Sequence, residues 1–196
     1  MRLVVFGAAG RTGRVVVALG LDRGHEVTAF VRRPDAFDPV PSGLHVEVGD
    51  ALDGAAVEGV AAGHQAAISV LGVAEDAPPT ALSDATASVV RALERSGPQR
   101  LVVLMTVGVL LTKVSPEFAQ VTEEHRRNLE VLRASSLDWV GVVAPGITDD
   151  APTGTVHMEV EQRGPNWEIA RGDLAAALLD EAVEPAHLRT AVGVSN

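Results

Sequence analysis

Short apolar runs recur along the chain and alternate with segments of helix-forming composition. Each run is apolar at consecutive rather than alternate positions, which is typical of strands that are buried on both faces of a parallel sheet. The segments between them are long enough to form helices that cross from one strand to the next. We expect strands at 3–6, 25–31, 44–48, 66–71, 101–105 and 139–143, and helices at 11–22, 53–62, 83–95 and 117–134.

This alternation predicts an α/β fold, a Rossmann-like doubly wound parallel sheet with helices on both faces, because crossovers between parallel strands are right-handed. Residues 151–170 interrupt the pattern, and we expect 155–161 and 167–170 to form a small β-ribbon. A last helix beginning near Asp173 and a strand at 190–194 complete the expected cap. With no linker or repeat, residues 1–196 are expected to form one domain, with substrate-cap elements within about 107–170.

A glycine-rich segment follows the first predicted strand and opens the first predicted helix. Residues 7–13 read GAAGRTG, a G-x-x-G-x-x-G spacing that resembles short-chain dehydrogenases. The first glycine permits a tight turn, the second leaves the backbone open to a diphosphate, and the third lets the helix pack closely. A turn that only connects strand and helix is the alternative. The expected dinucleotide contacts are Gly7, Ala9, Gly10, Arg11, Thr12 and Gly13.

The end of the second strand carries Arg32 and Arg33, where NAD-preferring sites place a carboxylate for the ribose hydroxyls. Guanidinium groups suit a 2′-phosphate, so the sequence favours NADP(H), with NAD(H) possible. Two solvated arginines, or a pair neutralised by Asp35, are the alternative. The domain is therefore expected to be an NAD(P)-binding Rossmann domain.

Residues at the ends of the third and fourth strands complete the expected cofactor site. Asp50 and Ala51 lie where the adenine would be read, although Asp50 also suits the start of the next helix. Leu71 and Gly72 are expected beside the ribose and diphosphate. Residues 76–79, with paired prolines, are either a loop over the cofactor or a surface connector.

Composition narrows the partners and the chemistry. The chain has 16 Lys+Arg against 26 Asp+Glu, a net charge of −10, which disfavours nucleic acid and anionic membranes as partners. Without Cys or Tyr, and with Lys113 as its one lysine, the chain can form neither a thiolate nucleophile nor a Tyr–Lys catalytic pair. No metal site is expected, because the six His are scattered. We expect a cytoplasmic protein with no membrane segment and a small-molecule partner.

The N-terminal segment is similar to the NmrA-like NAD(P)-binding group of atypical short-chain dehydrogenases. Several stretches resemble the biliverdin-IXβ reductase (flavin reductase) family: 28–32, 46–50, 121–125, 129–132 and 163–165. The resemblance runs in the same order over nearly the whole chain. It implies an NADPH-binding reductase, monomeric in the family, that passes hydride to flavins and in some members to linear tetrapyrroles.

The chain departs from the family pattern around the expected nicotinamide. The family motif Thr-Ser-Ala reads Thr106-Val107-Gly108 here, and Pro-His-Ile reads Pro145-Gly146-Ile147. Glu117 also stands where the family has an Arg beside the substrate pocket. These departures weaken the expectation of tetrapyrrole reduction and leave the cofactor motif intact.

Two residues are candidate catalytic groups. Thr106 is expected to orient the nicotinamide, or alternatively to make a hydrogen bond at the strand end. His125 is expected either to border the pocket or to be solvated on a charged helical face. The loop Pro145-Gly146-Ile147 is expected to offer backbone groups to the carboxamide, or to be a simple turn.

The sequence therefore predicts an NAD(P)H-dependent reductase whose hydride acceptor is a flavin, a quinone or a similar conjugated molecule. Flavin is expected as a substrate rather than as a bound prosthetic group. The alternative is a non-catalytic NADP(H)-sensing, NmrA-like regulator. An epimerase is disfavoured because the Tyr–Lys pair is missing.

Overall fold

The computed structural model describes residues 1–72 and 77–196. The helices are α1 (Arg11–Asp22), α2 (Gly54–Ala61), α3 (Ala81–Ser96), α4 (Pro116–Ala134) and α5 (Arg171–Val183), with short 3₁₀ helices η1 (Pro34–Phe37) and η2 (Val107–Leu110). The strands are β1 (Arg2–Phe6), β2 (Glu26–Val31), β3 (Leu44–Val48), β4 (Ala66–Ser69), β5 (Arg100–Thr106), β6 (Asp138–Ala144), β7 (Gly146–Thr148), β8 (His157–Val160), β9 (Glu168–Ala170) and β10 (Thr190–Ser195).

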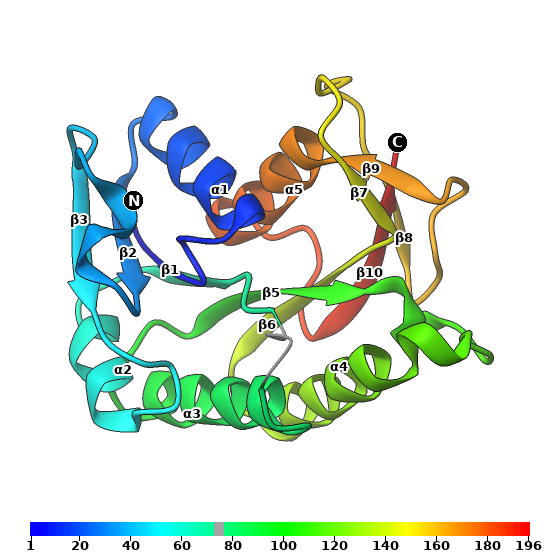
Figure 1. The fold of residues 1–196 in the computed structure, drawn as a ribbon, viewed down its shortest axis with the longest axis horizontal. Helices are drawn as coiled ribbons and strands as arrows, with labels where there is room; N and C mark the ends of the chain where they lie inside the picture. The colour runs from blue at the N-terminus through cyan, green and yellow to red at the C-terminus, as the bar shows by residue number, and fades with distance from the viewer. Residues whose placement is uncertain (73–76) are drawn as a thin grey trace.

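The main sheet has eight strands in the order β3-β2-β1-β4-β5-β6-β10-β8. Its strands run parallel except for β8, which pairs antiparallel with β10. Helices α1 and α5 cover one face, and α2, α3 and α4 cover the other (Figure 1). This confirms the predicted Rossmann-like doubly wound sheet.

Burial on both faces explains the continuous apolar runs. Along β1, Leu3 and Val5 belong to the core beneath α1 and α5, whereas Val4 and Phe6 belong to the core above α2, α3 and α4. All four side chains are fully buried. Because successive strand side chains point to opposite faces, each strand supplies both cores at once.

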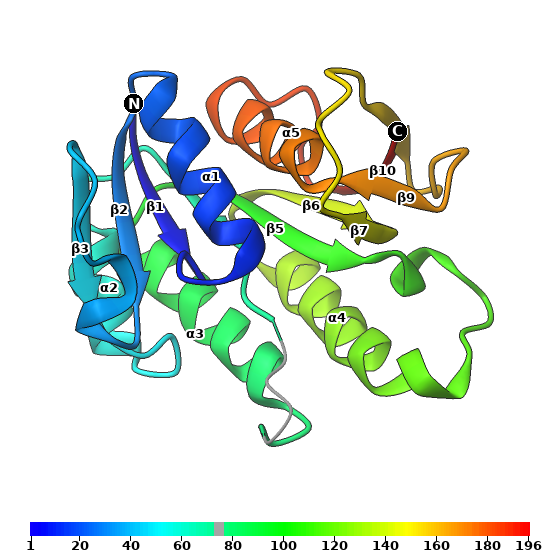
Figure 2. The same cartoon turned by 45° about the horizontal axis from the view of Figure 1, so that its top comes forward.

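The C-terminal region differs from the expected pairing. The segments 155–161 and 167–170 do contain strands, yet β8 pairs with β10 and β9 pairs in parallel with β7. The β-ribbon prediction was therefore wrong in its pairing, because β8 joins the edge of the main sheet beside β10, whereas β9 forms a separate two-stranded sheet with β7. Figure 2 shows β7 and β9 next to α5, at the end of the molecule opposite β3.

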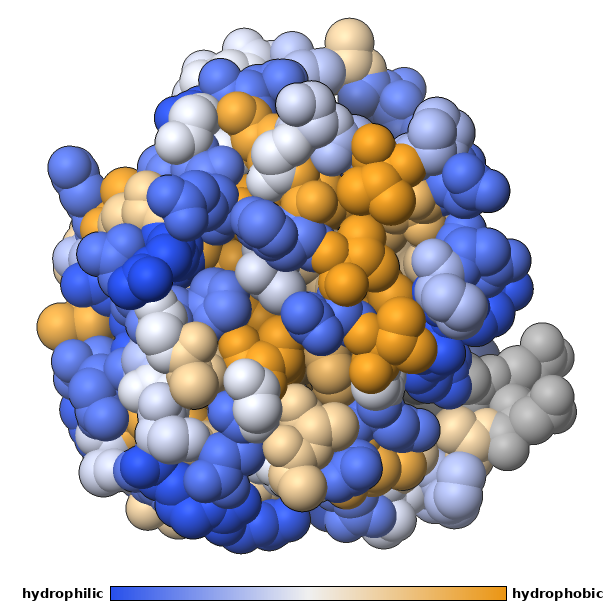
Figure 3. Space-filling view, turned by 90° about the vertical axis from the view of Figure 1, so that its left-hand side faces the viewer, coloured by the Kyte–Doolittle hydropathy of each residue, from blue (hydrophilic) through white to orange (hydrophobic). Residues whose placement is uncertain are grey.

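Two further surface features bear on possible partners. Among the described helices, none is long and apolar enough to cross a membrane. Apolar side chains gather on the face that carries β3 (Figure 3), where Val48 and Leu52 are 54% and 53% exposed. Leu52 also borders the first of the two cavities described below.

Candidate functional site

The strand order reverses between β1 and β4, and the glycine turn lies at this point. Gly7 has φ +80°, and a Cβ there would stand 2.7 Å from the carbonyl oxygen of Val70. A Cβ on Gly13 would stand 2.2 Å from the carbonyl oxygen of Gly7. The turn therefore requires glycine at both positions, one for its positive φ and its approach to β4, the other for the approach of α1.

The N-terminus of α1 opens toward the same crevice. Gly10 is the N-cap residue, and no side chain caps this helix end. The first N–H groups of α1 therefore lack intrahelical partners and carry the positive end of the helix dipole. A Cβ on Gly10 would approach only the carbonyl oxygen of Gly7, at 3.3 Å. These features fit a dinucleotide diphosphate.

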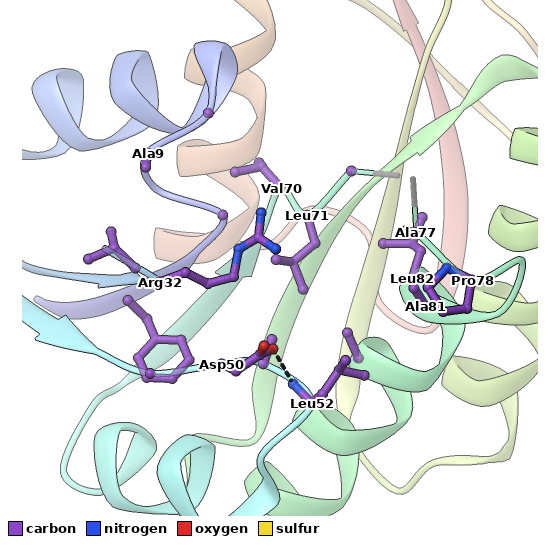
Figure 4. A pocket seen from close by; sticks show the side chains of 18 residues that line it. Ala9, Arg32, Asp50, Leu52, Val70, Leu71, Ala77, Pro78, Ala81 and Leu82 are labelled. Atoms are coloured by element: carbon purple, nitrogen blue, oxygen red, sulfur yellow. Dashed lines mark hydrogen bonds between the residues drawn. The ribbon is translucent and has the colours of Figure 1, made fainter. Parts of the chain in front are cut away.

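A cavity of about 540 Å³ runs along the carboxyl ends of β1 to β4. Arg32 and Asp50 point into it, from the end of β2 and from the loop after β3 (Figure 4). Of the predicted cofactor residues, this cavity is lined by Gly7, Ala9, Gly10, Arg32, Asp50, Ala51, Leu71 and Gly72.

The polar groups of this cavity differ in how they are held. Asp50 accepts a hydrogen bond from the backbone N–H of Leu52 at 3.0 Å, which fixes its carboxylate within the loop. Arg32 forms no ion pair with any residue in 1–72 or 77–196, so the alternative of neutralisation by Asp35 is not observed. The guanidinium of Arg32 is thus the cation that this cavity presents to a ligand. Arg33 is exposed and lies outside the lining.

A second cavity of about 350 Å³ continues from the first toward β5 and β6. The two share four lining residues, so they form one elongated cleft across the switch point. The shared residues are Gly10, Val70, Leu71 and Gly72, and the second cavity adds Arg11, Thr12, Leu104, Met105, Thr106, His125, Ala144, Pro145, Ile147 and Arg171. The sequence-predicted Thr106, His125, Pro145 and Ile147 are therefore brought together.

His125 is buried rather than solvated, with 7% of its surface exposed. Burial lowers the pKa of its imidazole to about 4, and the nearby Glu124 offsets this only in part. Its Nδ1 is buried with no hydrogen-bond partner among the described residues. His125 therefore faces the second cavity as a neutral imidazole at neutral pH.

Besides Arg33, two other predicted residues lie outside both cavities, because the fold engages each of them elsewhere. Gly13 is covered by the glycine turn that it packs against. Gly146 donates its N–H to the carbonyl oxygen of Trp167 at 3.0 Å, because it begins the β7–β9 ladder. That N–H is consequently committed within the protein and not open to a carboxamide.

The structure adds lining residues that the sequence reasoning missed. Val70 and Phe30 lie on strands that had been predicted, and only the sheet order shows that they meet the same crevice. Arg171 reaches the second cavity from the start of α5, far away in sequence. Ala77 and Pro78, from the predicted loop 76–79, border the first cavity, whereas Asp76 lies outside the described residues.

The cleft offers hydrogen-bond donors and apolar walls rather than a metal centre. Within the described part of the chain, no group of three or more His, Asp or Glu side chains could hold a metal ion. The acidic neighbours of His125 on α4 diverge, since Glu123 is exposed and Glu124 is fully buried.

A family model described as NAD(P)H-binding matches residues 7–185. The fold and the cleft thus define a dinucleotide-binding Rossmann protein, and the chain belongs to this NAD(P)H-binding family. Its features agree with the expected atypical, NmrA-like short-chain dehydrogenase group.

Solved structures share the fold over the full length of the chain. An anaerobilin reductase from Escherichia coli is 25% identical, with a TM-score of 0.82 and coverage of 100% of this chain and 97% of that one. A candidate NADH-flavin reductase from Streptococcus pneumoniae is 23% identical, with a TM-score of 0.83 and coverage of 100% and 99%. A candidate epimerase from Bacteroides thetaiotaomicron is 22% identical, with a TM-score of 0.88 and coverage of 99% and 96%.

Proposed function

We propose that the protein is an NAD(P)H-dependent reductase that passes a hydride to a planar conjugated acceptor such as a flavin or a quinone. The observation that carries this proposal is the elongated cleft across the strand-order reversal. Its first part has the shape and polar groups for an adenosine, and its second part brings Thr106 and His125 together beside apolar walls.

The cofactor would be held by the glycine turn and by Arg32. The open N-terminus of α1 provides N–H donors for the diphosphate, and Asp50 faces the adenine end. Because Arg32 has no ion-pair partner among the described residues, it suits the 2′-phosphate of NADP(H). The bound nicotinamide would supply the hydride. Binding of NAD(H) is allowed but lacks this contact.

The second cavity favours an acceptor that delocalises negative charge. Reducing an isolated ketone requires a proton donor at its oxygen. Here Thr106 has a hydroxyl, which is too weak an acid for that task, and His125 is neutral at physiological pH because burial lowers its pKa to about 4. These two groups can orient rings by hydrogen bonding, and orientation alone can account for much of the rate.

Relatives support the same chemistry. The E. coli structure is an anaerobilin reductase, and the S. pneumoniae structure is a candidate NADH-flavin reductase. Both types of acceptor are conjugated ring systems, which is the kind of acceptor that the residues around the second cavity favour.

The test is to mix purified protein with NADPH and one acceptor at a time, and to follow loss of the reduced-nicotinamide absorbance. We expect turnover with FMN or a quinone and none with an unactivated ketone. His125→Gln and Thr106→Val should lower kcat with conjugated acceptors. Tight NADPH binding without oxidation by any acceptor would overturn the proposal and favour an NADP(H)-sensing regulator.

A further inference from the structure

Arg171 is a buried cation at the border of the second cavity. It is the first residue of α5 and follows β9 directly. Only 7% of its surface is exposed, although arginine is rarely buried without paired charge. It lines the cavity beside Arg11 and Thr12 of the glycine turn.

Arg171 connects the glycine turn to the segment after β7. Its Nη1 donates a hydrogen bond to Thr12 Oγ1 at 2.9 Å, and its Nε donates to Asp149 Oδ1 at 2.6 Å. The hydrogen bond from Arg171 holds the pKa of Asp149 below its usual value, and the charge of Arg11 acts in the same direction. Hydrogen bonds thus link Asp149 to Arg171 and Arg171 to Thr12, at the N-terminus of α1.

These hydrogen bonds restrict the direction of the Thr12 hydroxyl. A guanidinium can only donate, so the oxygen of Thr12 is the acceptor in its bond with Arg171. The hydroxyl hydrogen of Thr12 must therefore point elsewhere, and Thr12 lines the same cavity as the uncapped N–H groups of α1. A hydroxyl that accepts from a cation is also a stronger donor.

The charge of Arg171 is only partly matched within the protein. Its partner Asp149 has a side chain that is 70% exposed, so solvent shares that carboxylate. Of the five N–H groups of a guanidinium, two make hydrogen bonds to residues in 1–72 or 77–196, which leaves three for other partners. An anion in the second cavity would complete this arrangement.

We infer that Arg171 is a further cofactor-binding residue, which orients the Thr12 hydroxyl toward the diphosphate of NAD(P)H and adds positive charge at its nicotinamide side. Asp149 acts as a positioning residue for the guanidinium. This inference rests on the cofactor-binding half of the proposed function and does not depend on the acceptor or on turnover.

The test compares two ligands that differ at the diphosphate. Dissociation constants for NADPH and for adenosine 2′-monophosphate, which ends before the diphosphate, would be measured by calorimetry. Arg171→Gln should weaken NADPH binding by about tenfold or more and change adenosine 2′-monophosphate binding by less than about twofold. Thr12→Val should do the same, and Thr12→Ser should restore most of the affinity.

The double variant distinguishes a shared role from two separate ones. If Arg171 acts through Thr12, the loss in Arg171→Gln/Thr12→Val should fall well short of the product of the single losses. Arg171→Lys keeps the charge and should lose less NADPH affinity than Arg171→Gln. Equal weakening of both ligands in Arg171→Gln, or no weakening of either, would overturn the inference.

The inference and the proposed reductase activity fail in different ways. If the unmodified protein binds NADPH and Arg171→Gln weakens that binding selectively, the role of Arg171 holds even when no acceptor is reduced. If the unmodified protein does not bind NADPH, both proposals are wrong.

Discussion

The carboxylate of Glu124 on α4 accepts hydrogen bonds from both the backbone N–H and the hydroxyl of Ser83, each at 3.2 Å, in the first turn of α3. Glu124 is fully buried, and Arg127 of the same helix also donates to it. Burial would raise the pKa of Glu124, but the hydrogen bonds from Arg127 and Ser83 lower it overall. The charged carboxylate therefore ties α4 to the helix end whose Ala81 and Leu82 border the first cavity.

Replacing Glu124 should destabilise the fold much more than replacing its neighbour. Glu124→Ala leaves buried N–H groups of α3 and the guanidinium of Arg127 without their partner, at an expected cost of about 3 kcal/mol in the free energy of unfolding. Glu123→Ala is a matched control, because Glu123 pairs with the same Arg127 at 3.3 Å but its side chain is 54% exposed. Its loss should stay below about 0.5 kcal/mol.

Urea denaturation of the three proteins at neutral pH checks this prediction. Because the pKa of Glu124 is lowered in the folded state, the charged carboxylate stabilises the fold at neutral pH. This stabilisation should be lost as the pH falls through the folded-state pKa of Glu124. Similar unfolding free energies for the two alanine variants would show that Glu124 does not hold α3.

A methyl group at Gly13 should disrupt the glycine turn. The new Cβ would stand 2.2 Å from the carbonyl oxygen of Gly7 and 2.7 Å from Cα of Ala8, so the backbone must move. Gly13→Ala should therefore lower the melting temperature and weaken NADPH binding. Gly59→Ala is the control, since nothing lies within 4 Å of its Cβ and a helical Gly→Ala change stabilises by up to about 1 kcal/mol. A Gly13→Ala variant with unchanged stability and affinity would contradict the close packing.

The choice between NADPH and NADH should depend on Arg32 more than on Arg33. Only Arg32 lines the first cavity, although both side chains are exposed enough to meet a ligand. Arg32→Ala should weaken NADPH binding by about 10- to 100-fold, the equivalent of one charge-assisted hydrogen bond, and leave NADH binding nearly unchanged. Arg33→Ala should have a smaller effect. Equal loss for the two cofactors in Arg32→Ala would remove the 2′-phosphate contact from the proposal.

Burial of His125 should make stability depend on pH. Its folded-state pKa of about 4 lies below the ordinary value of 6.5, so between these values the unfolded state binds the extra proton. Stability should then rise as pH increases from about 4 to about 6.5, by about 3 kcal/mol from this residue. Denaturant melts across this range should show a smaller slope for His125→Gln, and an unchanged slope for the exposed control His157→Gln. If both variants keep the slope, His125 is not buried as a neutral group.

Much of the fold follows from local pattern. The apolar runs at 3–6 and 101–105 became buried strands because a strand covered on both faces needs no polar side, and that requirement is visible in the sequence. The glycine spacing likewise placed Gly7 and Gly10 at the cleft, because turn geometry is a local property of the backbone.

What the sequence did not determine are contacts between segments far apart along the chain. Arg171 meets Thr12 across 159 positions, and Glu124 meets Ser83 across 41, and neither pair leaves a local signal. The strands β8 and β9 also pair with strands other than each other, because β10 and the short strand β7 come to lie beside them only in the folded chain. The sequence by itself determined which segments are strands and helices, because each type of element has its own periodicity of apolar residues. Only the tertiary structure decided that His125 is buried and that the two cavities join into one cleft, because packing brings together residues that are distant in sequence.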